Sequence, residues 1–158
     1  PEHPLNMVSR WSVGSDKDSI IKRAAFNGMG LVIWQDVFGV WLPFSNKQKQ
    51  QIKKLKNVLN KYHNIVFGSN SVPLIETLSK GLICNQFCND NNQKILAIYN
   101  FTNKSIKGPL VALEPIAKIK YQQIFGIKSN LQIKKIKKIN TIFGTVPADE
   151  VILIYVKY

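Results

Sequence analysis

Polar and aromatic side chains directly follow an apolar run in the stretch GLVIWQDVFGVWLPFS, residues 30–45. Trp34 precedes an amide, Gln35, and a carboxylate, Asp36, and Trp41 lies further along. Amides and carboxylates hydrogen-bond hydroxyl groups, while an indole stacks on the apolar face of a sugar ring. These residues therefore predict a carbohydrate subsite. In the simpler alternative, Asp36 caps the following turn and the aromatic rings are core.

The elements around this stretch are those of an α/β repeat. Residues 15–28 predict a helix, in which Ser15 is the N-cap, Asp18 completes a capping pair, and Gly28 ends the helix. The segment LVIW that follows is apolar on both faces, which is typical of a parallel strand covered on both sides. Functional groups in parallel α/β folds lie at the carboxyl ends of strands, where Gln35 and Asp36 are expected.

A second helix is predicted from Ser45 or Asn46 onward. Its apolar residues recur at steps of three and four and form one face, while lysine and glutamine form the other. That face consists of Ile52, Leu55, Leu59, Tyr62 and Val66. In the simplest interpretation, the lysines face solvent on a helix at the outside of a barrel.

The sequence changes character near residue 68. Beyond it, short strand-like segments alternate with Gly, Pro and Asn turns, which predicts an antiparallel β-sandwich over 69–158. Residues 131–139, LQIKKIKKI, are expected to form one strand with a bulge. Residues 1–68 contain one clear parallel strand, and a barrel of eight needs about 250 residues. The predicted class is α+β, an incomplete (β/α) barrel end followed by the sandwich.

Catalysis of glycoside hydrolysis usually requires two carboxyl groups about 5 to 10 Å apart. Of the chain's nine acidic residues, Asp36 alone is expected at a strand end facing a site. No G-x-S-x-G elbow, P-loop or G-x-G-x-x-G motif occurs. The catalytic residues are therefore unknown, no cofactor is expected, and the chain by itself is expected to be inactive.

The net charge of +13 invites a nucleic-acid interpretation. Only Arg10 and Arg23 are arginines, however, and arginine makes the bidentate contacts to guanine and phosphate. A solvated lysine surface is favoured and nucleic acid is disfavoured. No run approaches the ~18 apolar residues of a membrane span, so no membrane partner is expected.

Cys84 and Cys88 lie four residues apart in CNQFC. In a strand that spacing is roughly 13 Å, too long for a disulfide, so two core-filling thiols are expected. His3 and His63 do not complete a zinc pattern, and no metal is predicted. Glycosylation acceptor patterns at Asn100 and Asn103 are weak support for secretion in so Asn-rich a chain, and the compartment is left open.

The stretch around Trp34-Gln35-Asp36, the lysine-rich helix and the β-rich tail together resemble the C-terminal end of TIM-barrel glycoside hydrolases. In such proteins the last barrel strand often ends in Trp-Glu-Asn or a similar polar pair, followed by an aromatic-Gly-x-Trp loop. YQQIFG (121–126) and the terminal EVILIYVKY are similar to elements of the tail. The resemblance implies that residues 1–68 are the final β/α unit and that the nucleophile and acid lie on earlier strands, outside this sequence. Gln35 stands where an acid is common, so Asp36 is the better candidate for positioning substrate.

The first interpretation is therefore a C-terminal portion of a glycoside hydrolase, with Trp34, Gln35, Asp36 and Trp41 lining part of the sugar site. Its partners would be carbohydrate and the missing N-terminal barrel portion, in the same protein or a separate chain. A stand-alone carbohydrate-binding or interaction module is the second interpretation. A basic nucleic-acid-binding domain, whose affinity would fall steeply with salt, is the third.

Overall fold

The computed structural model of the chain describes residues 6–8, 16–32, 44–68, 70–115 and 118–158. The helices are α1 (Lys17–Phe26), α2 (Asn46–Lys61) and α3 (His63–Val66). The strands are β1 (Asn6–Val8), β2 (Gly30–Val32), β3 (Val72–Ile75), β4 (Leu82–Cys88), β5 (Gln93–Asn100), β6 (Ile106–Leu113), β7 (Lys120–Phe125), β8 (Gln132–Ile136), β9 (Ile139–Val146) and β10 (Glu150–Lys157).

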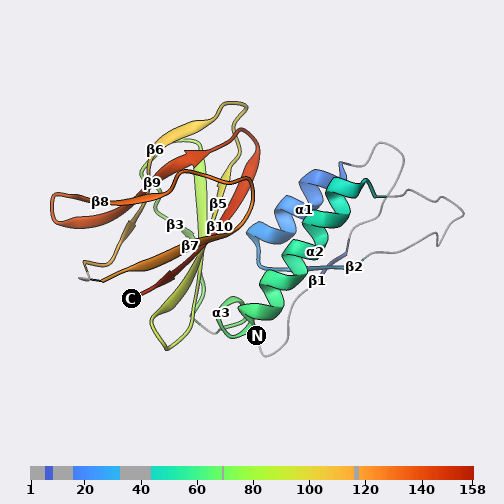
Figure 1. The fold of residues 1–158 in the computed structure, drawn as a ribbon, viewed down its shortest axis with the longest axis horizontal. Coiled ribbons are helices and arrows are strands. Elements are labelled where there is room, and N and C mark those ends of the chain that lie inside the picture. Colours follow the sequence, from blue (N-terminus) through green and yellow to red (C-terminus); the bar gives the residue numbers. More distant parts are fainter. Residues whose placement is uncertain (1–5, 9–15, 33–43, 69, 116–117) are drawn as a thin grey trace, which may run out of the picture.

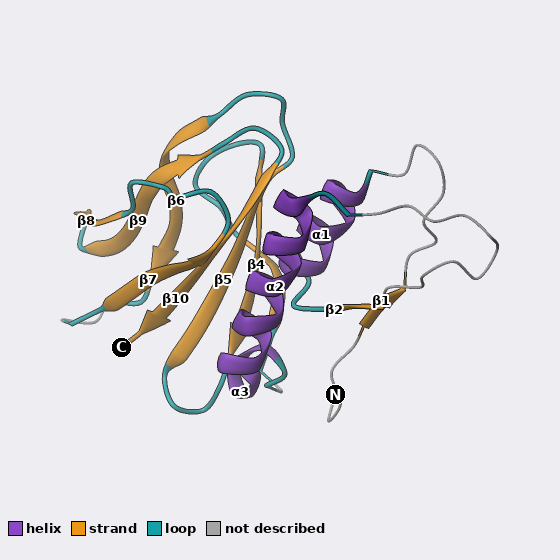
Figure 2. Cartoon of the chain, turned by 45° about the vertical axis from the view of Figure 1, so that its right-hand side comes forward, coloured by secondary structure: helices purple, strands orange, loops and turns teal. Residues whose placement is uncertain are grey.

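Two antiparallel sheets form the larger part of the molecule. One has five strands in the order β3-β4-β5-β10-β7, and the other has three in the order β6-β9-β8. Figure 1 shows the helices on the side of the five-stranded sheet away from the three-stranded one. In Figures 1 and 2, the short strands β1 and β2 lie beyond the helices, so the helices stand between them and the sheet.

The inner strands of the five-stranded sheet, β4, β5 and β10, contribute side chains to a core on each face. Along β10, Ile152, Ile154 and Val156 pack in the core between the two sheets. The alternate positions Val151 and Leu153 pack in a second core, together with residues of the helices. Because strand side chains alternate between faces, a strand covered on both sides must be apolar at nearly every position. The nearly continuous apolar run EVILIYV in β10 is explained by burial of this strand on both faces.

Helix α1 begins one residue later than the sequence predicts. Asp16, not Ser15, is the N-cap, and its carboxylate accepts a hydrogen bond from the backbone N–H of Ser19 at 3.0 Å. At the other end Gly28 has φ +63, which confirms its predicted role as the residue that ends the helix. A side chain there would collide with Val66 and Phe87, so glycine also permits the close approach of these layers.

The N-terminal part contains one more strand than the sequence analysis found. β1 pairs with β2 in parallel, with Met7 opposite Leu31 and Val8 opposite Val32. With α1 as the connection, these elements form a β-α-β unit followed by α2. β2 is half-buried rather than buried, because among the described residues it has helices on one face and β1 at one edge. The parallel pairing that its sequence predicted is confirmed.

Helix α2 begins at a full capping box. Ser45 accepts from the N–H of Gln48, whose side chain accepts from the N–H of Ser45. Leu55, Val58 and Leu59 are buried against the five-stranded sheet. The predicted amphipathic helix is confirmed, and its lysines face solvent.

The predicted antiparallel strands are present, with one correction. Residues 131–139 are not one bulged strand: β8 ends at Ile136, and β9, its hairpin partner, begins at Ile139. Lys137 and Lys138, at the tip of the hairpin, have φ values of 46 and 72. Two successive left-handed residues are the geometry of a type I′ turn, which is usually made by Asn-Gly. Since lysines occupy the turn, its usual signal is missing from the sequence.

The fold is thus α+β and mostly antiparallel, as predicted. The division into residues 1–68 and 69–158 stays a prediction. Helices from the first part and sheet residues from the second share one core, built by Ile21, Ala25, Leu55, Ala97 and Leu153 among others. A shared core of this kind couples the two parts in folding.

We expect Leu55→Ala to destabilise the whole protein by about 2–5 kcal/mol, because it opens a cavity between α2 and the sheet. Calorimetry should show one unfolding transition, shifted to lower temperature, with Lys56→Ala on the exposed face as the control. Two separate transitions, with the sheet unaffected by Leu55→Ala, would show that the two parts fold independently.

Candidate functional site

The carboxyl ends of β1 and β2 lie side by side at the pair Val8 and Val32. The predicted sugar-binding residues Trp34, Gln35, Asp36 and Trp41 belong to residues 33–43, which lie outside the described residues. The structure does describe the strand that leads to them, which ends one residue before that segment and beside a parallel neighbour.

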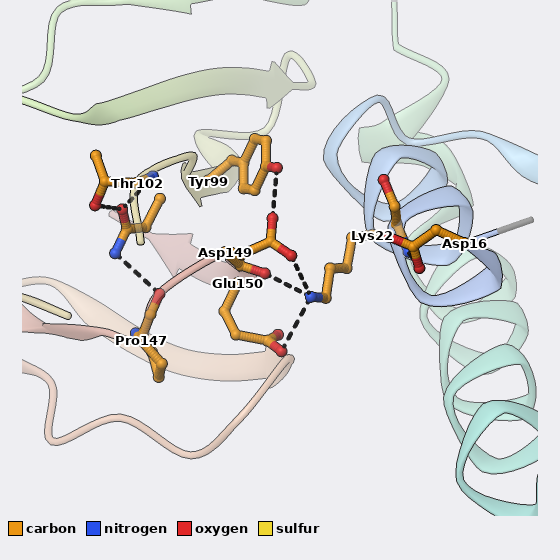
Figure 3. Close-up of polar contacts among 9 residues, drawn as sticks. Asp16, Lys22, Tyr99, Thr102, Pro147, Asp149 and Glu150 are labelled. Atoms are coloured by element: carbon orange, nitrogen blue, oxygen red, sulfur yellow. Dashed lines mark hydrogen bonds and ion pairs between the residues drawn. The ribbon is translucent and has the colours of Figure 1, made fainter. Parts of the chain in front are cut away.

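Within the described residues, the densest cluster of titratable groups surrounds Lys22 on α1 (Figure 3). Its Nζ donates to the backbone oxygen of Asp149 at 2.6 Å and to the Asp149 carboxylate at 2.9 Å. The carboxylate of Glu150 lies 3.4 Å from the same nitrogen. The hydroxyl of Tyr99 donates to the other Asp149 oxygen at 2.8 Å. The cluster joins α1 to β5 and to the start of β10.

The pKa values of the cluster follow from these contacts. Hydrogen bonds from Lys22 and then Tyr99 lower the pKa of Asp149 below its ordinary 3.8. Burial, followed by the bond to the Asp149 carboxylate, raises the pKa of Tyr99. For Lys22, burial lowers the pKa, but the bonds and charges of Asp149 and Glu150 outweigh it and the net pKa is raised. Each shift favours the charged lysine, the charged aspartate and the neutral tyrosine.

This chemistry suits an ion-pair clamp better than acid–base catalysis. The clamp consists of Lys22, Asp149 and Glu150. A general acid needs a raised carboxyl pKa, whereas that of Asp149 is lowered. Both carboxylates converge on one ammonium group, and the side chains of Lys22 and Glu150 are only 14% and 13% exposed. The clamp holds the helical layer on the sheet.

A second polar network lies beside the clamp and is also structural. Asn100 is fully buried, and its amide nitrogen donates to the backbone oxygens of Lys104, Val146 and Pro147. Its oxygen accepts from the backbone and hydroxyl of Thr102. The acceptor pattern at Asn100 is therefore closed to a glycosyltransferase in the folded chain, while Asn103 is exposed. Neither position is evidence about the compartment.

Both cysteines are free thiols, but only Cys84 fills the core as expected, because Cys88 is half-buried. Cys84 is buried between the sheets, which raises its pKa to about 12, and the Cys88 thiol donates to the backbone oxygen of Asn70. No cluster of metal-binding side chains occurs within the residues that the structure describes. In the same part of the chain, no helix combines the length and apolar character needed to cross a membrane.

Asp149 lies in the turn before β10, and sequence reasoning did not find the clamp. Lys22 and Asp149 are 127 residues apart, and no local spacing relates them. One signal was available: the pair DE at positions 149–150 stands at the start of the most apolar strand, and acidic pairs beside buried strands need a counterion. The sequence does not say which of its many lysines supplies that counterion.

No protein-family model matches the sequence, and comparison with curated proteins gives no significant match. Among solved structures, two crystal structures of trehalose-6-phosphate hydrolase from Bacillus licheniformis are similar to 75% of this chain. The identities are 18% and 17%, and the TM-scores are 0.48 and 0.47. This chain covers 22% of the length of each, so it spans less than a quarter of that enzyme. A likeness at these values carries no argument about activity.

We expect Asp149→Asn to reduce stability at neutral pH by about 0.5 kcal/mol, a modest value because the aspartate is partly exposed. The folded-state pKa of Asp149 is lowered, so its contribution is complete above pH 3.8 and is lost as the pH falls through that lower value. The difference between the wild type and the variant should therefore shrink in acid. Urea unfolding from neutral pH to below pH 3.8 measures it.

Asparagine tolerates the left-handed backbone of residue 149, where φ is +48, so the substitution isolates the charge. Glu76→Gln, at an exposed position, is the matched control. An Asp149→Asn difference that stayed constant down to the lowest pH would contradict the ion-pair interpretation.

Proposed function

We propose that this chain is the C-terminal portion of a glycoside hydrolase, made of the last β/α elements of a (β/α) barrel and an accessory β-sandwich. The observation that carries the proposal is the parallel pairing of β1 with β2 on the far side of the helices from the sandwich. Parallel sheets occur almost only with both faces covered and with several strands. A two-strand parallel sheet covered by helices on one face is what an excerpt of a barrel would contain.

The adjacent carboxyl ends of β1 and β2 supply the second step. In (β/α) barrels the loops after the strands build the active site at one end of the barrel. Residues 33–43, which follow β2, carry Trp34, Gln35, Asp36 and Trp41. In the proposal Asp36 and Gln35 hydrogen-bond sugar hydroxyls, and the two indoles stack on sugar faces. Neither polar residue is assigned acid or base chemistry.

The nucleophile and general acid are assigned to earlier barrel strands in the remainder of the protein. This assignment agrees with the chemistry of the described residues, because the carboxylates of Asp149 and Glu150 are held as counterions of Lys22. The sandwich then has a structural role, since it covers the outer face of the last two barrel helices.

The first experiment is a gel of source-cell extract probed with an antibody against this chain. The chain has a mass of 18.0 kDa, and we expect a native product that is heavier by about 20 kDa or more. The additional mass would correspond to the missing strands of a barrel. The chain by itself should release no nitrophenol from a panel of nitrophenyl glycosides. A native product of 18.0 kDa, or hydrolysis by the chain alone, would overturn the proposal.

In the native full-length product, Asp36→Asn should lower kcat/KM for the best glycoside by about 10- to 100-fold. That is the loss expected for one hydrogen bond between a charged group and a substrate hydroxyl. Asp90→Asn, which makes the same change in charge in a turn of the sandwich, is the control and should leave the kinetics unchanged. Equal activity of the wild type and Asp36→Asn would remove Asp36 from the sugar site.

A further inference from the structure

A surface groove of about 450 Å³ runs along β7, the outer edge of the five-stranded sheet. One wall is formed by α2, and the other by the segment that connects β7 to β8. Its volume falls in the range of small-molecule sites, about 300–1,000 Å³. The lining residues are Lys54, Tyr121, Gln122, Gln123, Gly126, Lys128, Ser129 and Leu131. All of these positions lie outside the stretch that carries the proposed function.

The floor of the groove is fixed by internal hydrogen bonds. The Gln123 amide donates to the backbone oxygens of Phe125 and Ile127, and its oxygen accepts from the N–H of Ser129 at 2.8 Å. Gly126 has φ +88, and a Cβ there would lie 2.3 Å from the backbone oxygen of Val151. The connecting segment is therefore held close to the sheet, and no ligand is needed to shape it.

Tyr121 gives the groove an aromatic surface. Its hydroxyl donates to the backbone oxygen of Leu131 at 3.2 Å, which holds the ring in place across the segment between β7 and β8. The residue is nevertheless 38% exposed. A ring that is anchored at its hydroxyl and open at its side can stack against an apolar ligand face at little entropic cost.

The remaining polar groups are positively charged or neutral. Lys54 on α2 and Lys128 on the opposite wall are exposed, and Gln122 presents a further exposed amide. No carboxylate is found among the described residues that line the groove. Two ammonium groups on opposite walls favour an anionic ligand, and the amide and ring favour one that also has hydroxyls and an apolar face.

We propose that this groove binds an acidic saccharide, a short chain of sugar rings that carries carboxylate, sulfate or phosphate groups. Side chains alternate along a strand, so Tyr121 lies on the face of β7 toward the three-stranded sheet and Gln122 on the face toward α2. The saccharide therefore runs across the exposed edge of β7. Tyr121 stacks on a ring on the first face, Gln122 hydrogen-bonds a hydroxyl on the second, and Lys54 and Lys128 pair with the anionic groups. None of its residues belongs to the stretch that begins after β2, so variants of the groove leave the sequence of that stretch unchanged. Failure of this site is therefore distinguishable from failure of the proposed function.

The test is a titration of the full chain with trigalacturonate, followed by calorimetry and by amide chemical shifts. The fully methyl-esterified trimer, which has the same shape without charge, is the matched ligand, and inorganic phosphate tests the anion alone. The double variant Lys54→Gln/Lys128→Gln should weaken trigalacturonate binding by about tenfold or more. Lys104→Gln/Lys107→Gln, which makes the same change in charge away from the groove, should change affinity less than twofold.

Tyr121→Ala should also weaken binding, whereas Tyr121→Phe, which keeps the ring, should retain most of it. The proposal is supported if the acid trimer binds, shifts amides along the groove and discriminates between the two lysine pairs. It is overturned if the methyl ester binds equally well, if both lysine variants lose affinity equally, or if no saccharide binds. Stronger displacement of the trimer by an oligodeoxythymidylate, with loss in both variants, would assign the charge to nucleic acid instead.

Discussion

The rest of the structure depends on a central sheet that is buried on both faces. β5 and β10 pair along eight residues, and each sends alternate side chains into the two cores. At roughly 25 cal/mol per Å² of buried apolar surface, such strands contribute most of what opposes the entropy of ordering the chain. The consequence is that neither the helices nor the three-stranded sheet can be removed without exposing one face of these strands.

The clamp at Lys22 follows from this arrangement. β10 begins at the edge of the layer in which α1 packs, and Asp149 in the turn before it and Glu150, its first residue, both reach Lys22 on the helix. Half-buried carboxylates are costly unless they are paired, and Lys22 is the group that the helix places there. The clamp therefore fixes orientation more than it adds stability. A tilt of α1 would separate one ammonium group from two carboxylates at once.

The sequence predicted the elements better than their partners. Local signals were sufficient for the cap of α2 and the glycine end of α1, because each depends on neighbouring residues. β1 was missed because three residues are too few to show a period. The hairpin at Lys137 and Lys138 was missed because its turn lacks the usual glycine, and sheet packing imposed the left-handed backbone instead.

The candidate sites differ in the same way. The stretch from Trp34 to Trp41 is visible in the sequence because its residues are contiguous. The groove at β7 is not visible in the sequence, because Lys54 and Lys128 are 74 residues apart in the chain and come together only when α2 packs beside the edge strand.

The position of the groove at a sheet edge explains part of its composition. An unpaired strand edge invites association with another chain, and charged residues are a usual protection against it. Here the lysines flank an anchored tyrosine and a segment fixed by Gln123. Protection of the edge explains the charges, but it does not require a preformed floor or an exposed ring. Those two features are what a ligand site adds.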